Sequence, residues 1–241
     1  MLTSRSLNNP HFQHSGDIWR DFPSLAAGVL YADGITAGVS AGDRADRFAA
    51  AAKSRLAARS EGELPEIQAW RRAFSRMGLK PTQYRCASEA LLRRFRKEGS
   101  LPRLNPLVDL CNAVSLAFAI PVAALDVAKV TWPLEVRYAA GDEEYLTFSG
   151  DVERPGPGEV IFADRAGRAH ARRWTNRQSG LSAVQDSTTA VLIVAEALHD
   201  SAARDVRELT EALIAEVGAA WSVTPSAAVL TRSSPGFTFG P

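Results

Sequence analysis

The chain has 241 residues, of which 46% are hydrophobic and 23% are charged, which is enough for one large domain or two small ones around a sizeable buried core. Its 28 lysines and arginines nearly balance 27 aspartates and glutamates, so the whole molecule cannot be a general polyanion binder of the histone type. The two cysteines, Cys86 and Cys111, are too few for a disulfide framework or a four-cysteine zinc site.

The beginning of the chain argues against export. Residues 1–20 are polar and lack the basic start and the continuous apolar stretch of a signal peptide. The most apolar window, residues 110–125, is shorter than a bilayer span and is interrupted by Pro121. We therefore expect a cytoplasmic protein in a reducing compartment, with no membrane partner.

The first half of the chain is predicted to be mostly helical. Residues 27–35 carry the small and β-branched side chains of a short strand, which ends at the turn signal Asp33-Gly34. Helical spacing and end signals then predict four helices, over residues 43–59, over 66–76 after Pro65, over 85–97 before Gly99, and from Asn105-Pro106 to a point before Pro121.

The second half is predicted to form a sheet. Residues 134–138 and 145–148 alternate apolar with polar side chains, while residues 159–162 and 190–194 look like buried strands. An amphipathic helix over residues 203–217 would cap that sheet. We predict an α+β fold with helices packed on a mixed, mainly antiparallel sheet, as a single domain over residues 1–225, followed by a flexible tail over 226–241.

Two basic clusters are candidate nucleic-acid contacts. Residues 71–103 are strongly basic, and the end of the third predicted helix could meet phosphates or could simply be a solvated face. The candidate phosphate-binding residues are Arg85, Arg93, Arg94, Arg96 and Lys97. A second cluster, on a predicted hairpin over residues 165–177, surrounds Trp174, and guanidinium groups beside an indole suit a stacked nucleotide.

Motifs for other chemistries are missing from the sequence. The four histidines, His11, His14, His170 and His199, have no ligand partner at metal-binding spacing, so we assign no metal. Neither a Walker motif nor a dinucleotide fingerprint is present, so no nucleotide cofactor is expected. Cys86 would be a nucleophile only if His170 came near it, and we interpret it as a buried structural thiol.

Three segments together resemble one known family. Residues 105–126, with the sequence NPLVDLCNAVSLAFAIPVAALD, resemble the pocket helix of the B3/B4 editing domain of the phenylalanyl-tRNA synthetase β-subunit. That family carries an Asp, a Thr-Asn pair, an apolar stretch and a Pro-Met-His-Ala-Phe-Asp turn, and the chain keeps this spacing at Asp109, Asn112, Pro121 and Asp126. Residues 158–164 resemble the strand before its pocket hairpin, and residues 184–188 its acidic-Thr turn. The resemblance spans roughly residues 80–200, and the rest is similar to free-standing members.

The resemblance implies a B3/B4-like fold and a trans-acting aminoacyl-tRNA editing hydrolase, a second sieve that deacylates mischarged tRNA. By resemblance, Asn112 and Arg177 would be catalytic, because an amide can orient a water and a guanidinium can stabilise an oxyanion. The implied substrate-binding residues are Cys111, Ser115, Trp174, Asn176 and Gln178. The resemblance implies mischarged tRNA as the partner, and DNA is not expected as one.

Three positions depart from the family pattern. Cys111 stands where the family has Thr, Ala123 stands where its turn has His, and residues 178–180 offer no carboxylate where the synthetase glutamate recognises the tyrosine hydroxyl. Losing that acceptor removes a basis for tyrosine specificity. The alternatives are a non-catalytic module that binds tRNA or a small molecule such as an amino acid, and a protein that docks on the translation machinery. The sequence leaves the amino acid, the tRNA and the oligomeric state open.

Overall fold

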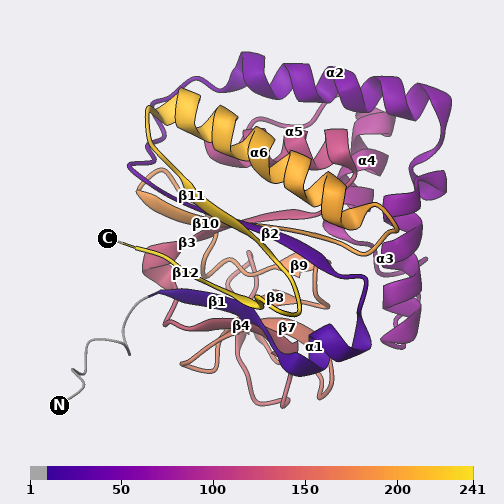
Figure 1. The fold of residues 1–241 in the computed structure, drawn as a ribbon, viewed down its shortest axis with the longest axis vertical. Coiled ribbons are helices and arrows are strands. Elements are labelled where there is room, and N and C mark those ends of the chain that lie inside the picture. The colour runs from indigo at the N-terminus through magenta and orange to yellow at the C-terminus, as the bar shows by residue number, and fades with distance from the viewer. Residues whose placement is uncertain (1–9, 241) are drawn as a thin grey trace.

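Two β-sheets and a layer of helices make up the fold. The computed structural model describes residues 10–240, so the first nine residues of the predicted polar lead and the last residue of the predicted tail lie outside that range. Helices α2, α5 and α6 lie on one side of a four-stranded sheet, and a six-stranded sheet lies on its other side (Figure 1). The helices are α1 (Gly16–Asp21), α2 (Gly42–Ala58), α3 (Pro65–Arg76), α4 (Ala87–Glu98), α5 (Pro106–Phe118) and α6 (Ala202–Trp221), with short 3-10 turns η1 (Glu61–Glu63) and η2 (Val127–Lys129).

The strands divide into two larger sheets and one short hairpin. The four-stranded sheet has the order β11 (Ser226–Leu230), β2 (Ala26–Asp33), β10 (Ala190–Ala197) and β3 (Val122–Asp126). The six-stranded sheet has the order β12 (Gly236–Thr238), β1 (His11–His14), β4 (Leu134–Tyr138), β7 (Val160–Asp164), β8 (Ala169–Arg172) and β9 (Arg177–Gln178), and β5 (Tyr145–Leu146) pairs with β6 (Val152–Glu153). The β1–β4 pair is parallel, whereas the other strand pairs are antiparallel. The predicted mixed, mainly antiparallel α+β fold is confirmed.

The predicted helices form where local signals place them. The Asn105 side chain accepts a hydrogen bond from the backbone N–H of Leu107 at 3.0 Å, and Pro106 fills the first position of α5. Gly99 ends α4 in the left-handed conformation with φ of 79°. Within residues 10–240, every helix is too short or too polar to cross a membrane.

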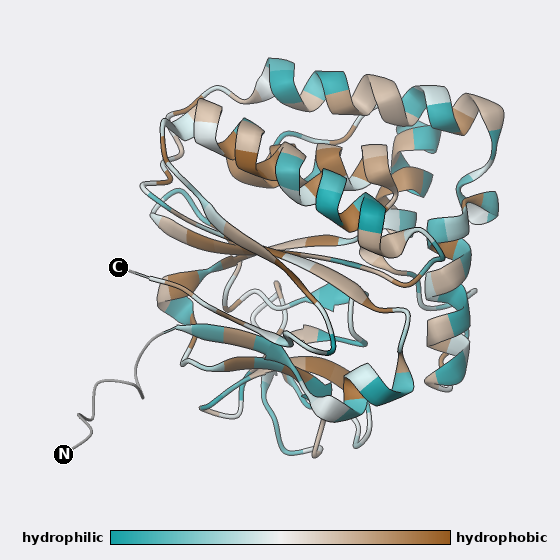
Figure 2. Cartoon of the chain, viewed as in Figure 1, coloured by the Kyte–Doolittle hydropathy of each residue, from teal (hydrophilic) through white to brown (hydrophobic). Residues whose placement is uncertain are grey.

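The central strands are apolar along their whole length because both of their faces are covered. On β10, Leu192 and Val194 belong to the core between the two sheets, while Val191 and Ile193 belong to the core beneath the helices. Successive side chains of a strand point to opposite faces, so one apolar run supplies both cores. Figure 2 shows this run as brown strands between the helices and the lower sheet.

The predicted flexible tail is wrong. Strand β11 pairs with β2, and β12 pairs with β1, so the last residues form an edge of each larger sheet. Leu230 and Phe239 are buried, and Phe239 packs against Tyr31 and Trp132 with ring centroids 4.9 and 5.0 Å away. The small and polar residues around them, which favoured a tail, form the turn between the two strands and its flanks.

Candidate functional site

A cleft opens beside α5 where the helix faces strand β3 and the segment that follows β9. We call it the α5 cleft, and its cavity has a volume of about 240 Å³. Its walls come from α5 (Val108, Cys111, Asn112), from β3 (Val122, Ala124), from β9 (Gln178), and from the connections (Leu104, Asn105, Phe148, Ala183, Val184, Gln185, Asp186). Two predicted stretches, the pocket helix and the acidic-Thr turn, therefore meet here.

Hydrogen bonds fix the acidic-Thr turn beside β3. The Asp126 backbone N–H donates to the Ser182 carbonyl oxygen at 2.9 Å, and the Thr188 hydroxyl donates to the Asp126 carboxylate at 2.8 Å. The amide nitrogen of Gln178 donates to the Ala124 carbonyl oxygen at 2.7 Å. These bonds hold the far wall of the cleft at a set distance from α5, so the site is preorganised.

Asn112 is the polar side chain that α5 presents to the cleft. It is half-buried, and its amide makes no hydrogen bond with any residue in the range 10–240, so both its donor and its acceptor are free for a ligand. Its neighbour Cys111 is buried, and burial raises the pKa of that thiol to about 12. The Cys111 thiol is therefore neutral at physiological pH and forms part of the cleft wall.

Two exposed apolar side chains flank the mouth of the cleft. Phe148 is 74% exposed and Leu104 is 68% exposed, and both line the cavity. A large aromatic ring in solvent beside a cavity offers a platform on which a base can stack. Phe148 was expected at the end of a strand, but β5 ends at Leu146 and the ring lies in the loop before β6.

Ser115 and Asn176 do not face the α5 cleft. The Ser115 hydroxyl is buried and donates to the Ile120 carbonyl oxygen at 2.7 Å, which ties α5 to the chain that leaves it. The amide nitrogen of Asn176 donates to the Arg85 carbonyl oxygen at 2.7 Å and so fastens the hairpin to the start of α4. Ser115 lines neither this cleft nor the smaller cavity described next, so it is a wrong assignment as a pocket residue, whereas Asn176 lines the smaller cavity.

A second, smaller cavity lies between the two sheets. We call it the inter-sheet cavity, and its volume is about 60 Å³. Its lining comprises Ala87, Pro121, Val122, Ala123, Phe162, Ala171, Trp174, Thr175, Asn176, Arg177, Gln178, Val194 and Glu196. It shares Val122 and Gln178 with the α5 cleft, so the two cavities adjoin at these side chains.

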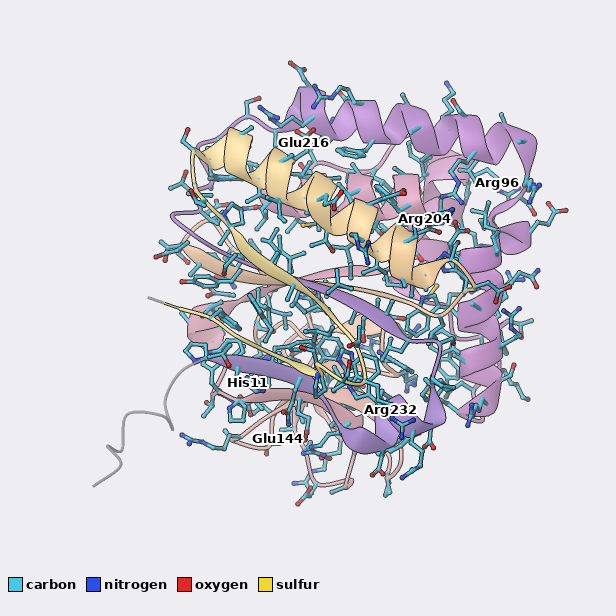
Figure 3. The ribbon with its side chains drawn as sticks, in the orientation of Figure 1. His11, Arg96, Glu144, Arg204, Glu216 and Arg232 are labelled. Carbon is cyan, nitrogen blue, oxygen red and sulfur yellow. The ribbon has the colours of Figure 1, made fainter. Side chains whose placement is uncertain are left out.

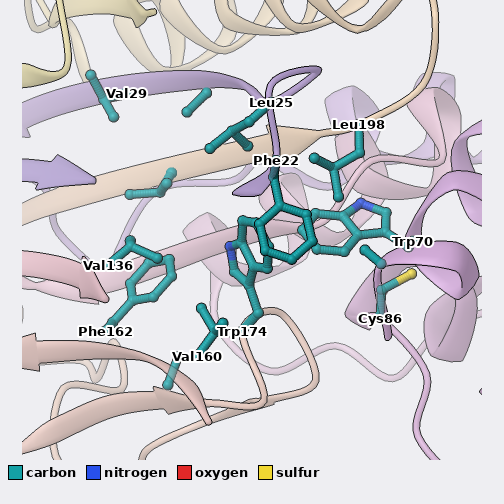
Figure 4. Packing of buried hydrophobic residues seen from close by; sticks show 14 of the residues in the cluster. Phe22, Leu25, Val29, Trp70, Cys86, Val136, Val160, Phe162, Trp174 and Leu198 are labelled. Carbon is teal, nitrogen blue, oxygen red and sulfur yellow. The ribbon is translucent and has the colours of Figure 1, made fainter. Parts of the chain in front are cut away.

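Trp174 belongs to the core and cannot stack on an exposed base. It is 0% exposed, and its ring stands edge-on to Trp70 and Phe22, with centroids 5.0 and 4.8 Å away (Figure 4). Its indole N–H donates to the Glu196 carboxylate at 2.8 Å. The expectation of a nucleotide stacked on Trp174 is therefore wrong, because an amphipathic ring in a hairpin can equally face inward.

Arg177 and Asn112 line different cavities. Arg177 lines the inter-sheet cavity, while its guanidinium group pairs with Glu153 at 3.2 Å and lies 5.4 Å from the Tyr145 ring centroid. The cation thus holds β6 against the hairpin and is separate from the Asn112 amide.

The predicted basic surface is partly neutralised by buried carboxylates. Arg96 and Arg93 lie 2.8 and 3.8 Å from Glu61, whose side chain is buried. Arg85 lies 3.5 Å from Glu89, and Arg94 pairs with the exposed Glu98 at 2.9 Å. Lys97 has no ion pair with residues 10–240. Figure 3 labels Arg96 of this group.

One cluster has donor types suitable for a metal ion. Atoms of Glu66, His199 and Asp205 lie within 4.8 Å of one another. Each residue is also engaged within the protein, because His199 Nε2 bonds Asp205 at 2.7 Å and Glu66 Oε1 accepts from Arg55 at 2.6 Å. These bonds use one side of each partner, and Glu66 Oε2 and His199 Nδ1 are buried without a hydrogen bond to residues 10–240.

Sequence reasoning missed Glu196, a carboxylate near the end of the apolar strand β10. The signal was present, since a charged residue inside a run of buried residues is rare unless it is paired. Its partner His14 comes from the polar lead, 182 residues away, and no local pattern connects the two.

Comparisons with known proteins identify a matching domain family. The B3/4 domain family profile matches residues 69–213, more than half of the chain. Phenylalanine–tRNA ligase beta subunits are similar over shorter stretches: the one from Haemophilus influenzae is 28% identical over 89 residues, covering 37% of this chain, and the one from Mannheimia succiniciproducens is 33% identical over 81 residues, covering 33%. An N-terminal fragment of the phenylalanyl-tRNA synthetase beta-subunit from Pyrococcus horikoshii aligns with a TM-score of 0.48 at 9% identity, over 90% of this chain and 50% of that one.

The similarity covers a small part of each curated relative. The matched stretch is 11% of the Haemophilus protein and 10% of the Mannheimia protein. The relatives therefore contain much that this chain does not match.

Proposed function

Because the chain belongs to the B3/4 domain family, we propose that it is an editing hydrolase that acts in trans and removes a wrongly attached amino acid from a tRNA. The α5 cleft is the observation that carries the proposal. It joins a free amide on α5 to an amide on β9, with an exposed aromatic ring at its mouth. We infer a cytoplasmic location, where charged tRNAs are used.

The cleft suits direct attack by water on an ester. The Asn112 amide N–H donates to the ester carbonyl oxygen as it becomes an oxyanion. The side-chain carbonyl oxygen of Gln178, which accepts no hydrogen bond from residues 10–240, orients the attacking water. The water oxygen bonds to the carbonyl carbon, the bond from that carbon to the ribose oxygen breaks, and a proton of the water passes to the ribose oxygen, which releases the amino acid and the tRNA hydroxyl. A covalent thiol intermediate is disfavoured, because burial raises the pKa of Cys111 to about 12.

A second candidate is a binding module without turnover. Among the residues lining the α5 cleft, the titratable groups are Asp186 and the neutral thiol of Cys111. A cleft built mainly of amides and apolar walls is also what an amino-acid or tRNA-end binder needs.

The first experiment follows ester loss from correctly and wrongly charged tRNAs with the purified protein, against a no-protein control. We expect turnover of a mischarged pair, and Asn112→Ala should lower the rate about 100-fold, since one oxyanion donor is typically worth about 100- to 1,000-fold. The matched control is Gln83→Ala, which removes an exposed amide outside the cleft.

The outcomes separate the two candidates. An unchanged rate for Asn112→Ala, with a folded protein by circular dichroism, would remove this amide from the site. Silence across the whole panel, with tRNA still bound at moderate salt, would establish the binding module instead.

A further inference from the structure

A buried carboxylate is part of the wall of the inter-sheet cavity. Glu196 is 2% exposed and accepts two hydrogen bonds at one oxygen, Oε1, from His14 Nε2 at 2.6 Å and from the Trp174 indole N–H at 2.8 Å. Burying a carboxylate costs several kcal/mol unless donors or cations compensate it. The groups around the two carboxylate oxygens of Glu196 must therefore compensate the cost of burying its charge.

The other oxygen of Glu196 is available to the cavity. Oε2 makes no hydrogen bond with any residue in the range 10–240, yet it is not enclosed, and Glu196 lines the cavity. A carboxylate oxygen with free lone pairs beside a cavity is an acceptor site.

Within residues 10–240, no lysine or arginine pairs with Glu196. Its ionisable neighbour is His14, which is 2% exposed and whose Nε2 contacts Oε1 at 2.6 Å, so this contact leaves Oε2 without a donor. The one lysine or arginine lining the cavity, Arg177, pairs with Glu153 at 3.2 Å. The cavity thus keeps an acceptor that a cationic ligand would satisfy best.

The size and walls of the cavity narrow the class of that cation. About 60 Å³ holds roughly four to six water-sized groups. The walls include Phe162, Val194 and Trp174, and the cavity offers one carboxylate. A divalent metal ion needs about six oxygen ligands, so these walls do not suit it. A primary ammonium group, small and able to donate three hydrogen bonds, fits one carboxylate and an amide at Gln178.

We infer that the inter-sheet cavity binds the free α-ammonium group of the amino acid that the substrate carries, with Glu196 Oε2 as its acceptor. This inference rests on the proposed function and adds a substrate class to it. The ester carbonyl then lies at the boundary of the two cavities, at Gln178, and the amino-acid side chain extends into the α5 cleft. Substrates with a free amine are accepted, and N-acylated ones are rejected.

The test measures binding directly, with probes that cannot be hydrolysed as esters. Alaninamide and N-acetylalaninamide are titrated into the full chain and followed by chemical-shift changes. We expect alaninamide to bind about 10- to 100-fold more tightly, the range for losing one charged hydrogen bond. Glu196→Gln, which keeps the shape and one oxygen acceptor, should abolish this preference.

Two further variants control for a general loss of charge and for a failure to fold. Glu144→Gln neutralises an exposed carboxylate that does not line the inter-sheet cavity or the α5 cleft, and it should retain the full preference. If Glu196→Gln does not fold, Ala123→Leu fills the cavity without changing the carboxylate and should prevent alaninamide from binding. Equal binding of the two amides, binding of neither, or an unchanged preference in Glu196→Gln would overturn the inference.

Deacylation assays then separate this inference from the proposed function. Equal turnover of aminoacyl-tRNA and its N-acetylated form would leave the hydrolase standing and contradict the role of Glu196. Amine-selective binding without any turnover would support the role of Glu196 and contradict the hydrolase.

Discussion

At the scale of single residues, Asp164 shows how polar groups are compensated in this fold. The carboxylate, at the end of β7, accepts hydrogen bonds from the backbone N–H groups of Thr131 and Arg168, from the Arg168 guanidinium group and from His170 Nε2 at 3.2 Å. Burial alone would raise the pKa of Asp164, but the bonds from His170 and Arg168 outweigh it and hold that pKa well below its usual range.

Asp164→Asn should therefore destabilise the protein in a pH-dependent way. The folded-state pKa lies below the unfolded value of about 3.9, so the contribution is present above about pH 3.9 and is lost as the pH falls below it. Urea unfolding should show a loss of about 1.5–3 kcal/mol at pH 7 that shrinks towards about pH 3. The control is Asp142→Asn, an exposed carboxylate. A difference of equal size at both pH values would contradict the account.

The sequence indicated which segments supply pocket residues, but it did not indicate which of their side chains are buried in the core. Asn112 and Gln178 were assigned to a pocket and do line one, because the family pattern fixes their place on the helix and hairpin. The side chains of Trp174 and Ser115 are suited to either a binding site or a core. Trp174 packs against Trp70, and the Ser115 hydroxyl bonds the Ile120 carbonyl oxygen, so both side chains belong to the core.

At the scale of elements, helix ends were predictable because their signals are local. The Asn105-Pro106 start and the Gly99 stop each depend on one or two residues. Strands β1 and β12 were missed because they are short, carry no clear alternation, and are stabilised by pairing with each other across the whole chain.

Truncation after residue 225 should destabilise the whole protein. It removes β11 and β12 and, with them, the buried side chains of Leu230 and Phe239, each worth about 2–5 kcal/mol when it is removed from a core. The expected loss of at least about 4 kcal/mol is a large part of a typical domain stability. Thermal unfolding should show a midpoint about 8 °C lower or more, or an insoluble product.

The control for the truncation is Arg232→Ala in the full chain, in the exposed turn between β11 and β12, which should leave the midpoint unchanged. If the truncated protein has the same unfolding midpoint as the full chain, the two strands add nothing to the stability of the core.

At the scale of the whole molecule, the charge distribution is less simple than the sequence suggests. The basic run appeared to supply five cations for phosphates, but the fold brings Glu61 from η1 against α4, where it pairs with Arg93 and Arg96. Glu61 precedes that run, and only tertiary packing places it there. Of the five candidates, exposed Lys97 and Arg94, whose partner Glu98 is itself exposed, remain the most available to a polyanion.

A salt titration of tRNA binding tests this surface. Because each neutralised phosphate releases counterions, removing one cation that touches a phosphate should reduce the slope of log affinity against log salt by about 0.7–0.9. Arg94→Ala combined with Lys97→Ala should therefore reduce the slope by about twice that amount. The double variant Arg207→Ala with Arg232→Ala removes the same charge from exposed positions on α6 and in the β11–β12 turn, so its slope should match the unmodified protein. If both double variants lower the slope equally, binding responds to net charge alone; if neither does, tRNA does not contact the end of α4.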